Sequence, residues 1–302
     1  MQPFRTILFA TDFSEGSDEA FRLACSLAAE NKTRLIVFHV VEPNWVAKEP
    51  VHFTQLSVEF FRGLPDEGRL EAIKQKMREV YTPNHPLDIE YDAREGDPSV
   101  EILHVAEEVR SDLIVMRTHG RTGLHWLLGG SVAIAVLRGA HCPVLAIHST
   151  EHPRKTEEIG VILHPTDFSK GSEAALRVAR LLARDLGARL VVLHVAPFDI
   201  LADGTMVAPM DPRVFRDTLE EMRQRLDGPD LKYPVETRFT QGDAAGEVLR
   251  VAKELECGLI VMGTHGRTGL GRLLMGSVVE FVMPRAACPV LVVKALQQVA
   301  AI

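Results

Sequence analysis

The 302-residue sequence predicts an α/β fold in two tandem copies, each a doubly wound sheet of five parallel strands. Two observations carry this prediction: an internal repeat that spans the chain, and a regular alternation of short apolar segments with amphipathic ones. The length suits two domains of about 150 residues each. The composition is that of an ordinary globular protein, since 46% of the residues are hydrophobic and 25% are charged.

Four segments of the first half recur in the same order in the second half. Residues 10–14 recur at 165–169 and residues 38–40 recur at 193–195, both 155 positions later. Residues 118–124 recur without change at 264–270, and residues 142–145 recur at 288–291, both 146 positions later. The first copy therefore holds nine extra residues between Val40 and Gly96. These matches predict domains over 1–150 and 157–302, with the polar residues 150–156 as a linker.

Each copy is predicted to begin with a short apolar strand, over residues 5–10 or 160–164, that ends in a polar turn. Ser14 and Ser169 are the expected N-caps of the next helix, since a serine hydroxyl accepts a hydrogen bond from a first-turn amide. The helix has apolar residues at helical spacing, namely Ala20, Leu23, Ala24, Leu27 and Ala28, then Ala175, Val178, Ala179, Leu182 and Ala183. Strands over 35–41 and 190–196 follow, and their uniformly apolar character indicates burial on both faces.

The second part of each copy continues the alternation. Strands are expected over 88–93 and 235–240, followed by Asp97 and Asp243 as N-caps of helices over 100–109 and 246–255. Strands over 113–116 and 259–262 lead into a glycine-rich loop, then a helix from Ser131 or Ser277 and a last strand over 144–148 or 290–294. Residues 45–70 lie in a variable region that is longer in the first copy, and they are expected to form a helix over the sheet, or alternatively to cap a pocket or accept an apolar ligand.

The glycine-rich loop of the second copy is the strongest candidate for chemistry. Gly263 and Gly266 follow a buried strand, and Gly276 and Ser277 come nine residues later. Glycines let backbone N–H groups approach an anion, and a helix N-terminus adds partial positive charge. The loop lacks both the Walker Gly-Lys-Ser/Thr ending and the Rossmann spacing. In the alternative interpretation, the glycines only turn the chain and Ser277 only caps a helix.

These motifs resemble the universal stress protein (UspA-type) family over nearly the whole chain: Gly-x2-Gly-x9-Gly-Ser after the fourth strand, Thr-Asp-Phe-Ser after the first, and a closing Cys-Pro-Val-Leu strand. The resemblance implies an adenine-nucleotide α-hydrolase-like fold that binds ATP, AMP or ADP, with or without Mg²⁺. In the second copy it implies a site made of Pro165, Asp167, Val195, Met262, Gly263, His265, Gly266, Gly276, Ser277 and Val278. Asp167 and Pro165 would lie at the base or ribose, Val195 at adenine and Met262 at the ribose, with the others around the phosphates.

The first copy departs from this pattern at two positions. Arg117 stands where the second copy has Gly263, and Ala10 stands where it has Pro165. A large side chain at a close-approach glycine should crowd a ligand, so weak binding or none is expected in the first copy. In the alternative, Arg117 turns outward and offers a cation to a phosphate.

The last strands carry a prediction about assembly. An apolar strand at a sheet edge invites pairing, and in dimers of the family this strand forms the subunit contact. The two last strands, residues 144–147 and 290–293, are therefore predicted to meet and to form an intramolecular pseudo-dimer. Homo-oligomers of such pseudo-dimers are compatible with this prediction.

Composition excludes other classes. A net charge of −7 disfavours nucleic acid and anionic membranes as partners, and no apolar stretch is long enough to span a membrane. The start of the chain does not resemble a signal peptide. The four cysteines form no Cys-x-x-Cys pair, which favours buried thiols, packing roles for Cys142 and Cys288, and a cytoplasmic location.

The remaining polar residues predict no catalytic or metal-binding group. His39 and His194 stand at equivalent places and are expected to make structural hydrogen bonds, and no metal-ligand spacing occurs. The sequence thus predicts an ATP- or AMP-binding universal stress protein that acts as a stress-response or signalling module through its second domain. The alternatives are a scaffold that binds no nucleotide, a protein for another small ligand or metal, and a slow ATPase.

Overall fold

In the computed structural model the chain forms two compact units, Met1–Glu157 (unit one) and Glu158–Ile302 (unit two). The structure describes residues 4–14, 16–29, 33–42, 68–118, 132–148, 159–197, 217, 220, 233–264 and 276–294. Each unit has its own set of five strands, its own helices and its own core.

Unit one alternates strands with helices along the chain. Its elements are β1 (Thr6–Ala10), α1 (Ser17–Ala29), β2 (Arg34–Val41), α3 (Arg69–Val80), β3 (Ile89–Glu95), α4 (Pro98–Glu108), β4 (Leu113–Thr118), α5 (Val132–Gly139) and β5 (Val144–His148). The strands stand in the order β3-β2-β1-β4-β5, and all of these neighbours pair in parallel.

Unit two repeats this plan. Its elements are β6 (Val161–Thr166), α6 (Lys170–Asp185), β7 (Arg189–Ala196), β8 (Glu236–Gln241), α8 (Ala244–Glu254), β9 (Leu259–Gly263), α9 (Ser277–Val282) and β10 (Val290–Val293). The strands stand in the order β8-β7-β6-β9-β10, again with parallel neighbours.

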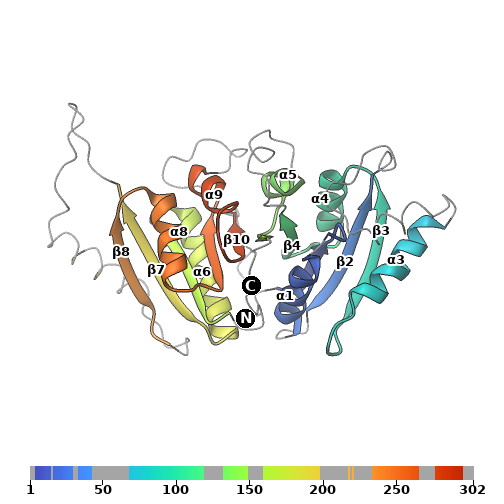
Figure 1. The fold of residues 1–302 in the computed structure, drawn as a ribbon, viewed down its shortest axis with the longest axis horizontal. Helices are drawn as coiled ribbons and strands as arrows, with labels where there is room; N and C mark the ends of the chain where they lie inside the picture. Colours follow the sequence, from blue (N-terminus) through green and yellow to red (C-terminus); the bar gives the residue numbers. More distant parts are fainter. Residues whose placement is uncertain are drawn as a thin grey trace. The chain divides into compact units, whose positions relative to one another are not determined.

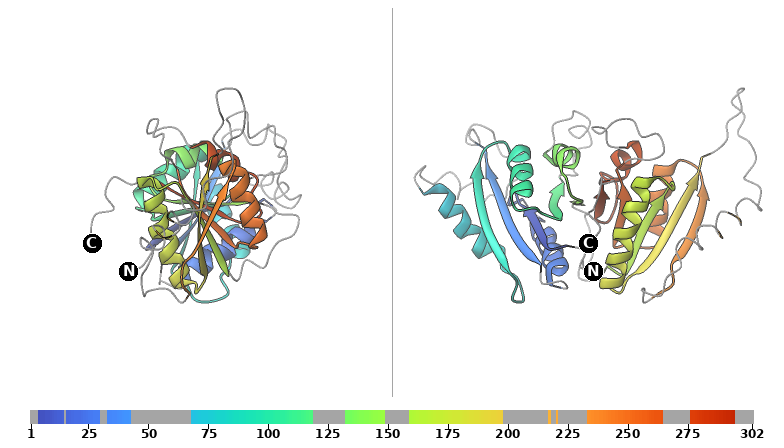
Figure 2. Two further views of the ribbon diagram at one scale, coloured as in Figure 1. Left: turned by 90° about the vertical axis from the view of Figure 1, so that its left-hand side faces the viewer. Right: turned by 180° about the vertical axis from the view of Figure 1, so that it is seen from behind.

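Helices cover both faces of each sheet, as the right-handed crossovers of parallel strands require. In unit two, α8 lies in front of the sheet in Figure 1, whereas α6 lies in front of it in the view from behind in Figure 2. α6 packs against β6, β7 and β9, while α8 packs against α9 and β8. Unit one pairs α4 with α5 in the same way. The predicted fold, two tandem α/β domains with parallel sheets, is confirmed.

The cores follow the apolar patterns of the sequence. The central strands β1, β2 and β4 are almost wholly buried, whereas the edge strands β3 and β8 are largely half-buried or exposed. All five predicted apolar positions of α1 are buried, and all but Val178 are buried in α6. The four cysteines are buried and form no disulfide, as expected for packing roles.

Three of the four predicted N-caps are confirmed. Asp97, Asp243 and Ser169 each accept hydrogen bonds from first-turn amides of α4, α8 and α6. The prediction for Ser14 is wrong, because α1 begins only at Ser17. Gly16 adopts a left-handed conformation (φ 89°) just before the helix, and the hydroxyl of Ser14 accepts a hydrogen bond from Arg117 Nη1 at 2.9 Å instead.

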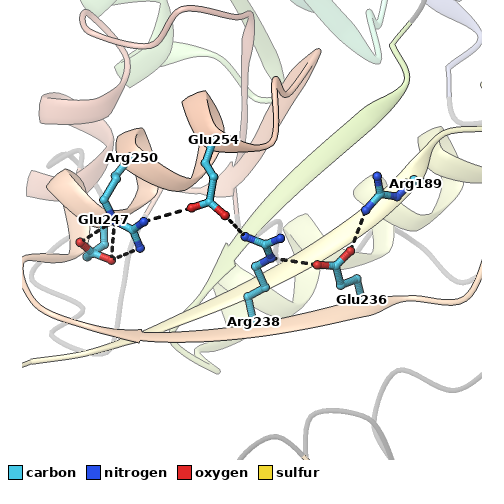
Figure 3. A network of polar contacts seen from close by, with 6 residues as sticks. All are labelled: Arg189, Glu236, Arg238, Glu247, Arg250 and Glu254. Carbon is cyan, nitrogen blue, oxygen red and sulfur yellow. Dashed lines mark hydrogen bonds and ion pairs between the residues drawn. The ribbon is translucent and has the colours of Figure 1, made fainter. Parts of the chain in front are cut away.

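Ion pairs cover the edge strand of the sheet in unit two. Figure 3 shows Arg189, Glu236, Arg238, Glu254, Arg250 and Glu247 in an alternating chain that links β7, β8 and α8. In unit one, Arg34 pairs with Glu90 at the places of Arg189 and Glu236, and Arg94 pairs with Glu108, which stands at the place of Glu254. Such exposed pairs contribute little to stability, because water and salt screen their charges. Their charges protect an edge strand from pairing with another chain.

Some predictions fall on parts that the structure does not describe. The predicted linker 150–156, almost all of the predicted covering segment 45–70, and loop residues His265 and Gly266 lie outside the described residues. The pairing of the last strands as a pseudo-dimer stays a prediction. Within the described residues, none of the helices is long and apolar enough to cross a membrane.

Candidate functional site

The candidate site of unit two lies at the carboxyl ends of β6 and β9, two neighbouring strands at the centre of the sheet. The chain leaves β6 for β7 on one side, and it leaves β9 for β10 on the other. Such a switch point leaves a crevice beyond the strand ends, which is where ligands bind in open α/β sheets.

The turn after β6 is held in an unusual backbone conformation. Phe168 has a positive φ of 62°, which is rare for a bulky residue. Its amide donates to Thr166 Oγ1 at 3.1 Å, and the amide of Ser169 donates to Asp167 Oδ1 at 3.0 Å. The equivalent Phe13 has φ 57° in unit one. Both copies therefore fold the Thr-Asp-Phe-Ser segment into one locked turn that presents an aspartate.

A histidine supports each of these turns. His194 Nδ1 lies 2.8 Å from the carbonyl oxygen of Thr166, and His39 Nδ1 lies 2.8 Å from that of Thr11. The Phe168 ring packs on the His194 ring at 4.8 Å between centroids. The predicted structural hydrogen bonds of His39 and His194 are confirmed. In the buried His39, desolvation lowers the pKa, so the neutral ring is favoured.

Gly263, at the end of β9, lies against the first turn of α6. A Cβ on Gly263 would lie 2.8 Å from the carbonyl carbon and oxygen of Gly171 and 3.1 Å from the amide nitrogen of Ser172. The glycine is thus required by the protein's own backbone. It brings the start of α6, and with it the turn that carries Asp167, close to the end of β9.

Unit one shows what an arginine does at the position of Gly263. The Arg117 side chain lies over the turn after β1: its Nη1 donates to Ser14 Oγ, and a Cβ on Gly16 would lie 3.2 Å from its Nε. Burial raises the pKa of Glu19 on α1, and the charges of Arg22 and then Arg117 oppose this rise in part. The equivalent glycines Gly16 and Gly171 also have different positions relative to their helices. Gly16 precedes α1, whereas Gly171 lies within α6.

The strands at the switch point pair over different lengths in the two units. In unit one, β1 and β4 pair as far as Ala10 opposite Met116. In unit two, the pairing of β6 and β9 ends at Leu163 opposite Ile260. The β6–β9 ladder is therefore the shorter one, and Pro165 lies beyond its end while it still stands opposite Leu193 of β7.

The glycine-rich loop starts and ends at one place. The amide of Gly276 donates to the carbonyl oxygen of Thr264 at 2.7 Å. The amide of Thr264 in turn donates to the carbonyl oxygen of Val293 at 3.0 Å. Gly276 is the N-cap of α9, whose first residues are Ser277 and Val278. These bonds bring the start of α9 to the end of β9.

The two remaining candidates take different positions. Val195 is half-buried near the end of β7, one residue beyond the last pair of the β6–β7 ladder, Thr166 opposite His194. On its other side Val195 pairs with Thr240 of β8. Met262 has a buried side chain on β9, opposite Val292 of β10. Among the described residues, no group of three or more His, Cys, Asp or Glu side chains is arranged to hold a metal ion.

His164 is a buried polar residue that the sequence did not single out. It is 0% exposed on β6, where unit one has Phe9. Burial lowers the pKa of His164 from 6.5 to about 4, while the bond to Val261 and the charge of Asp167 oppose this change. The ring is therefore neutral at pH 7. The sequence signal that could have identified this residue is that the second copy has His164 where the first copy has Phe9.

Acid is expected to destabilise unit two through His164. The folded pKa lies below the unfolded one, so the stabilisation is complete above about pH 6.5 and is lost as the pH falls towards about 4. The shift corresponds to roughly 3 kcal/mol. Urea unfolding at a series of pH values should show a steeper decline for the wild type than for His164→Phe. Equal slopes would contradict the prediction.

Comparisons with known proteins identify the family of this chain. The model of the universal stress protein family matches residues 3–148 and again residues 158–294. The chain belongs to the universal stress protein family. A universal stress protein of Mycolicibacterium smegmatis is 28% identical over 305 residues, covering 95% of this chain and 96% of that protein. Universal stress protein MJ0531 of Methanocaldococcus jannaschii is 34% identical over 154 residues, 82% of its length.

Solved structures agree on the fold of this universal stress protein. A universal stress protein from Archaeoglobus fulgidus superposes with a TM-score of 0.66 at 22% identity, covering 97% of both chains. The family and the tandem organisation predicted from the sequence motifs are thereby confirmed.

Proposed function

We propose that this universal stress protein binds one adenine nucleotide, ATP or its hydrolysis products AMP and ADP, in unit two. The observation that carries the proposal is the contact between Gly263 and the first turn of α6. It brings the aspartate turn close to the end of β9, where the glycine-rich part of the motif begins, so this contact supports one site made from both halves of the motif. Unit one has the same turn but has Arg117 at the contact.

In this proposal Asp167 accepts hydrogen bonds from the ribose, and the backbone near Val195 meets the edge of adenine. Gly263, His265, Gly266, Gly276, Ser277 and Val278 surround the phosphates, Pro165 shapes the floor, and Met262 borders the ribose. A carboxylate suits the hydroxyl donors of a ribose, while backbone groups suit the mixed donors and acceptors of a base. Mg²⁺ would enter with the phosphates, as their counter-ion.

The role that follows is a stress-response or signalling module whose state depends on the nucleotide. A bound ligand stabilises the folded unit by a few kcal/mol when it is abundant relative to its Kd. We place the protein in the cytoplasm, because its four cysteines are buried thiols outside any disulfide, as is usual in a reducing compartment. No acidic residue besides Asp167 is assigned to hold Mg²⁺ or orient water, so we propose binding rather than hydrolysis.

The nucleotide should accompany the protein through purification. Protein isolated without added ligand is denatured, and the released small molecules are identified by mass spectrometry. We expect an adenine nucleotide at no more than one per chain, and a higher midpoint of thermal unfolding after ATP is added to stripped protein. A different co-purified molecule, with no response of the stripped protein to ATP, would favour the scaffold or other-ligand alternative.

A further inference from the structure

The carbonyl group of Val261 on β9 receives a hydrogen bond from a side chain. His164 Nδ1 lies 2.8 Å from this carbonyl oxygen, and the imidazole is fully buried. A carbonyl only accepts hydrogen bonds, so the ring must donate from Nδ1. In the neutral ring, Nε2 is then an acceptor.

Pro165 explains why a side chain is needed here. In unit one the equivalent residue is Ala10, which pairs with Met116 on β4. A proline has no backbone N–H and cannot donate to a neighbouring strand. The ladder of unit two ends before Pro165. A buried carbonyl without a donor is unfavourable, by roughly 1–3 kcal/mol. His164 supplies the donor.

The other edge of the imidazole faces the aspartate turn. His164 Nε2 lies 3.4 Å from Ser172 Oγ in the first turn of α6. The same hydroxyl donates to Thr166 Oγ1 at 2.8 Å, and that oxygen accepts the amide of Phe168. The single hydroxyl hydrogen of Ser172 goes to Thr166 Oγ1, so Nε2 packs against Ser172 without a hydrogen bond. The imidazole is thus held by the Val261 carbonyl on one side and packs on the other side against the first turn of α6, next to the turn that carries Asp167.

The two copies use alternative pairs at these positions. Unit one has Phe9 and Ala10, an apolar side chain followed by a residue with a backbone donor. Unit two has His164 and Pro165, a donor side chain followed by a residue without one. Each pair provides one hydrogen-bond donor to the neighbouring strand, from the backbone in unit one and from the side chain in unit two. A mixed pair of Phe and Pro would provide none.

We propose that His164 and Pro165 act as a coupled pair at the nucleotide site of unit two. Pro165 ends the β6–β9 ladder at the crevice, and His164 is a positioning residue that replaces the lost donor and supports the turn with Asp167. The role at the site rests on the function proposed above. The coupling between the two residues does not, because it concerns the folding of unit two alone.

A double-mutant cycle in the full-length protein tests the pair. His164→Phe should lower the midpoint of thermal unfolding by roughly 3–8 °C, because the Val261 carbonyl loses its donor. Adding Pro165→Ala should recover most of this loss, since the backbone N–H returns. The affinity for ATP should fall about tenfold in His164→Phe and stay low in the double variant, whose ladder closes as in unit one. His164→Asn, which keeps a donor near Nδ1, should stay within about threefold of the wild type in affinity.

Phe9→His is the matched control, since Ala10 already supplies the donor in unit one. It should lower the thermal midpoint and leave the affinity for ATP unchanged. Additive thermal shifts in the cycle would overturn the coupling of His164 and Pro165. Full recovery of ATP affinity in the double variant would overturn the role of Pro165 in ending the β6–β9 ladder at the nucleotide site. Absence of ATP binding by the wild type would overturn the proposed function, whereas a coupled thermal cycle would still support the replacement of the donor.

Discussion

Gly263→Arg is expected to abolish nucleotide binding, with an affinity for ATP at least about 100-fold weaker, or about 3 kcal/mol. The first cause is steric, because a Cβ at this position would lie 2.8 Å from the backbone of Gly171. α6 would have to begin later, as α1 does in unit one. The second cause is the guanidinium, which would settle on Ser169 as Arg117 settles on Ser14.

Isothermal titration of ATP into the variant and the wild type measures this loss. Gly263→Ala introduces the steric contact without the charge and should lose an intermediate part of the affinity. Arg117→Gly is the matched control in unit one and should leave the affinity of unit two unchanged. If Gly263→Arg bound ATP as the wild type does, the crevice between β6 and β9 would not be the site.

Tyr81→Ala is expected to destabilise unit one by about 3–5 kcal/mol, the range for a large aromatic residue lost from a core. Tyr81 is 1% exposed and lies at the end of α3. Its ring packs on Phe9, Phe13 and Phe21 at 5.4, 5.7 and 5.2 Å between centroids. Its hydroxyl is hydrogen-bonded to Thr11 Oγ1 at 2.5 Å. The side chain thus joins α3 to the turn after β1.

Urea unfolding monitored by hydrogen exchange of the unit-one strands measures this effect. Tyr81→Phe removes only the hydroxyl and should cost about 1 kcal/mol. Tyr91→Phe removes a hydroxyl that donates to the Tyr81 carbonyl from a half-buried ring, and it should cost less. The affinity of the protein for ATP should not change in these variants. A cost below about 1 kcal/mol for Tyr81→Ala would contradict the packing described here.

The periodic and repeated features of the sequence were sufficient to predict most of the fold. Short apolar segments became the central strands because parallel strands buried on both faces need apolar side chains throughout. Asp97 and Asp243 were predictable as N-caps because a cap depends on amides only two or three residues away. The repeat then transferred each element from one copy to the other.

Contacts between distant residues were not predictable in this way. Ser14 does not cap α1, which begins at Ser17, and its hydroxyl accepts a hydrogen bond from Arg117, which lies 103 residues further along the chain. The identity of Arg117 was visible in the sequence, but its contact with the turn after β1 was not. The reason for Gly263 also differs from the expectation, since the backbone of Gly171 occupies the space that the sequence assigned to a ligand.

The candidate site shows the same division between local and distant information. The family motif indicated Pro165 and Asp167, and the structure gives both a place at the carboxyl end of β6. The family motif did not indicate His164, because nothing in a short apolar segment shows that the carbonyl of Val261, 97 residues away, needs a hydrogen-bond donor. Only the substitution of Phe9 by His164 between the copies marked the position.

The central claim is that the protein has one nucleotide site, in unit two. Equilibrium dialysis of the full-length protein against labelled ATP measures the number of sites directly, in the wild type and in Gly263→Arg. We expect one site per chain in the wild type and none in the variant. Two equal sites in the wild type, or one site that persists in Gly263→Arg, would contradict the claim.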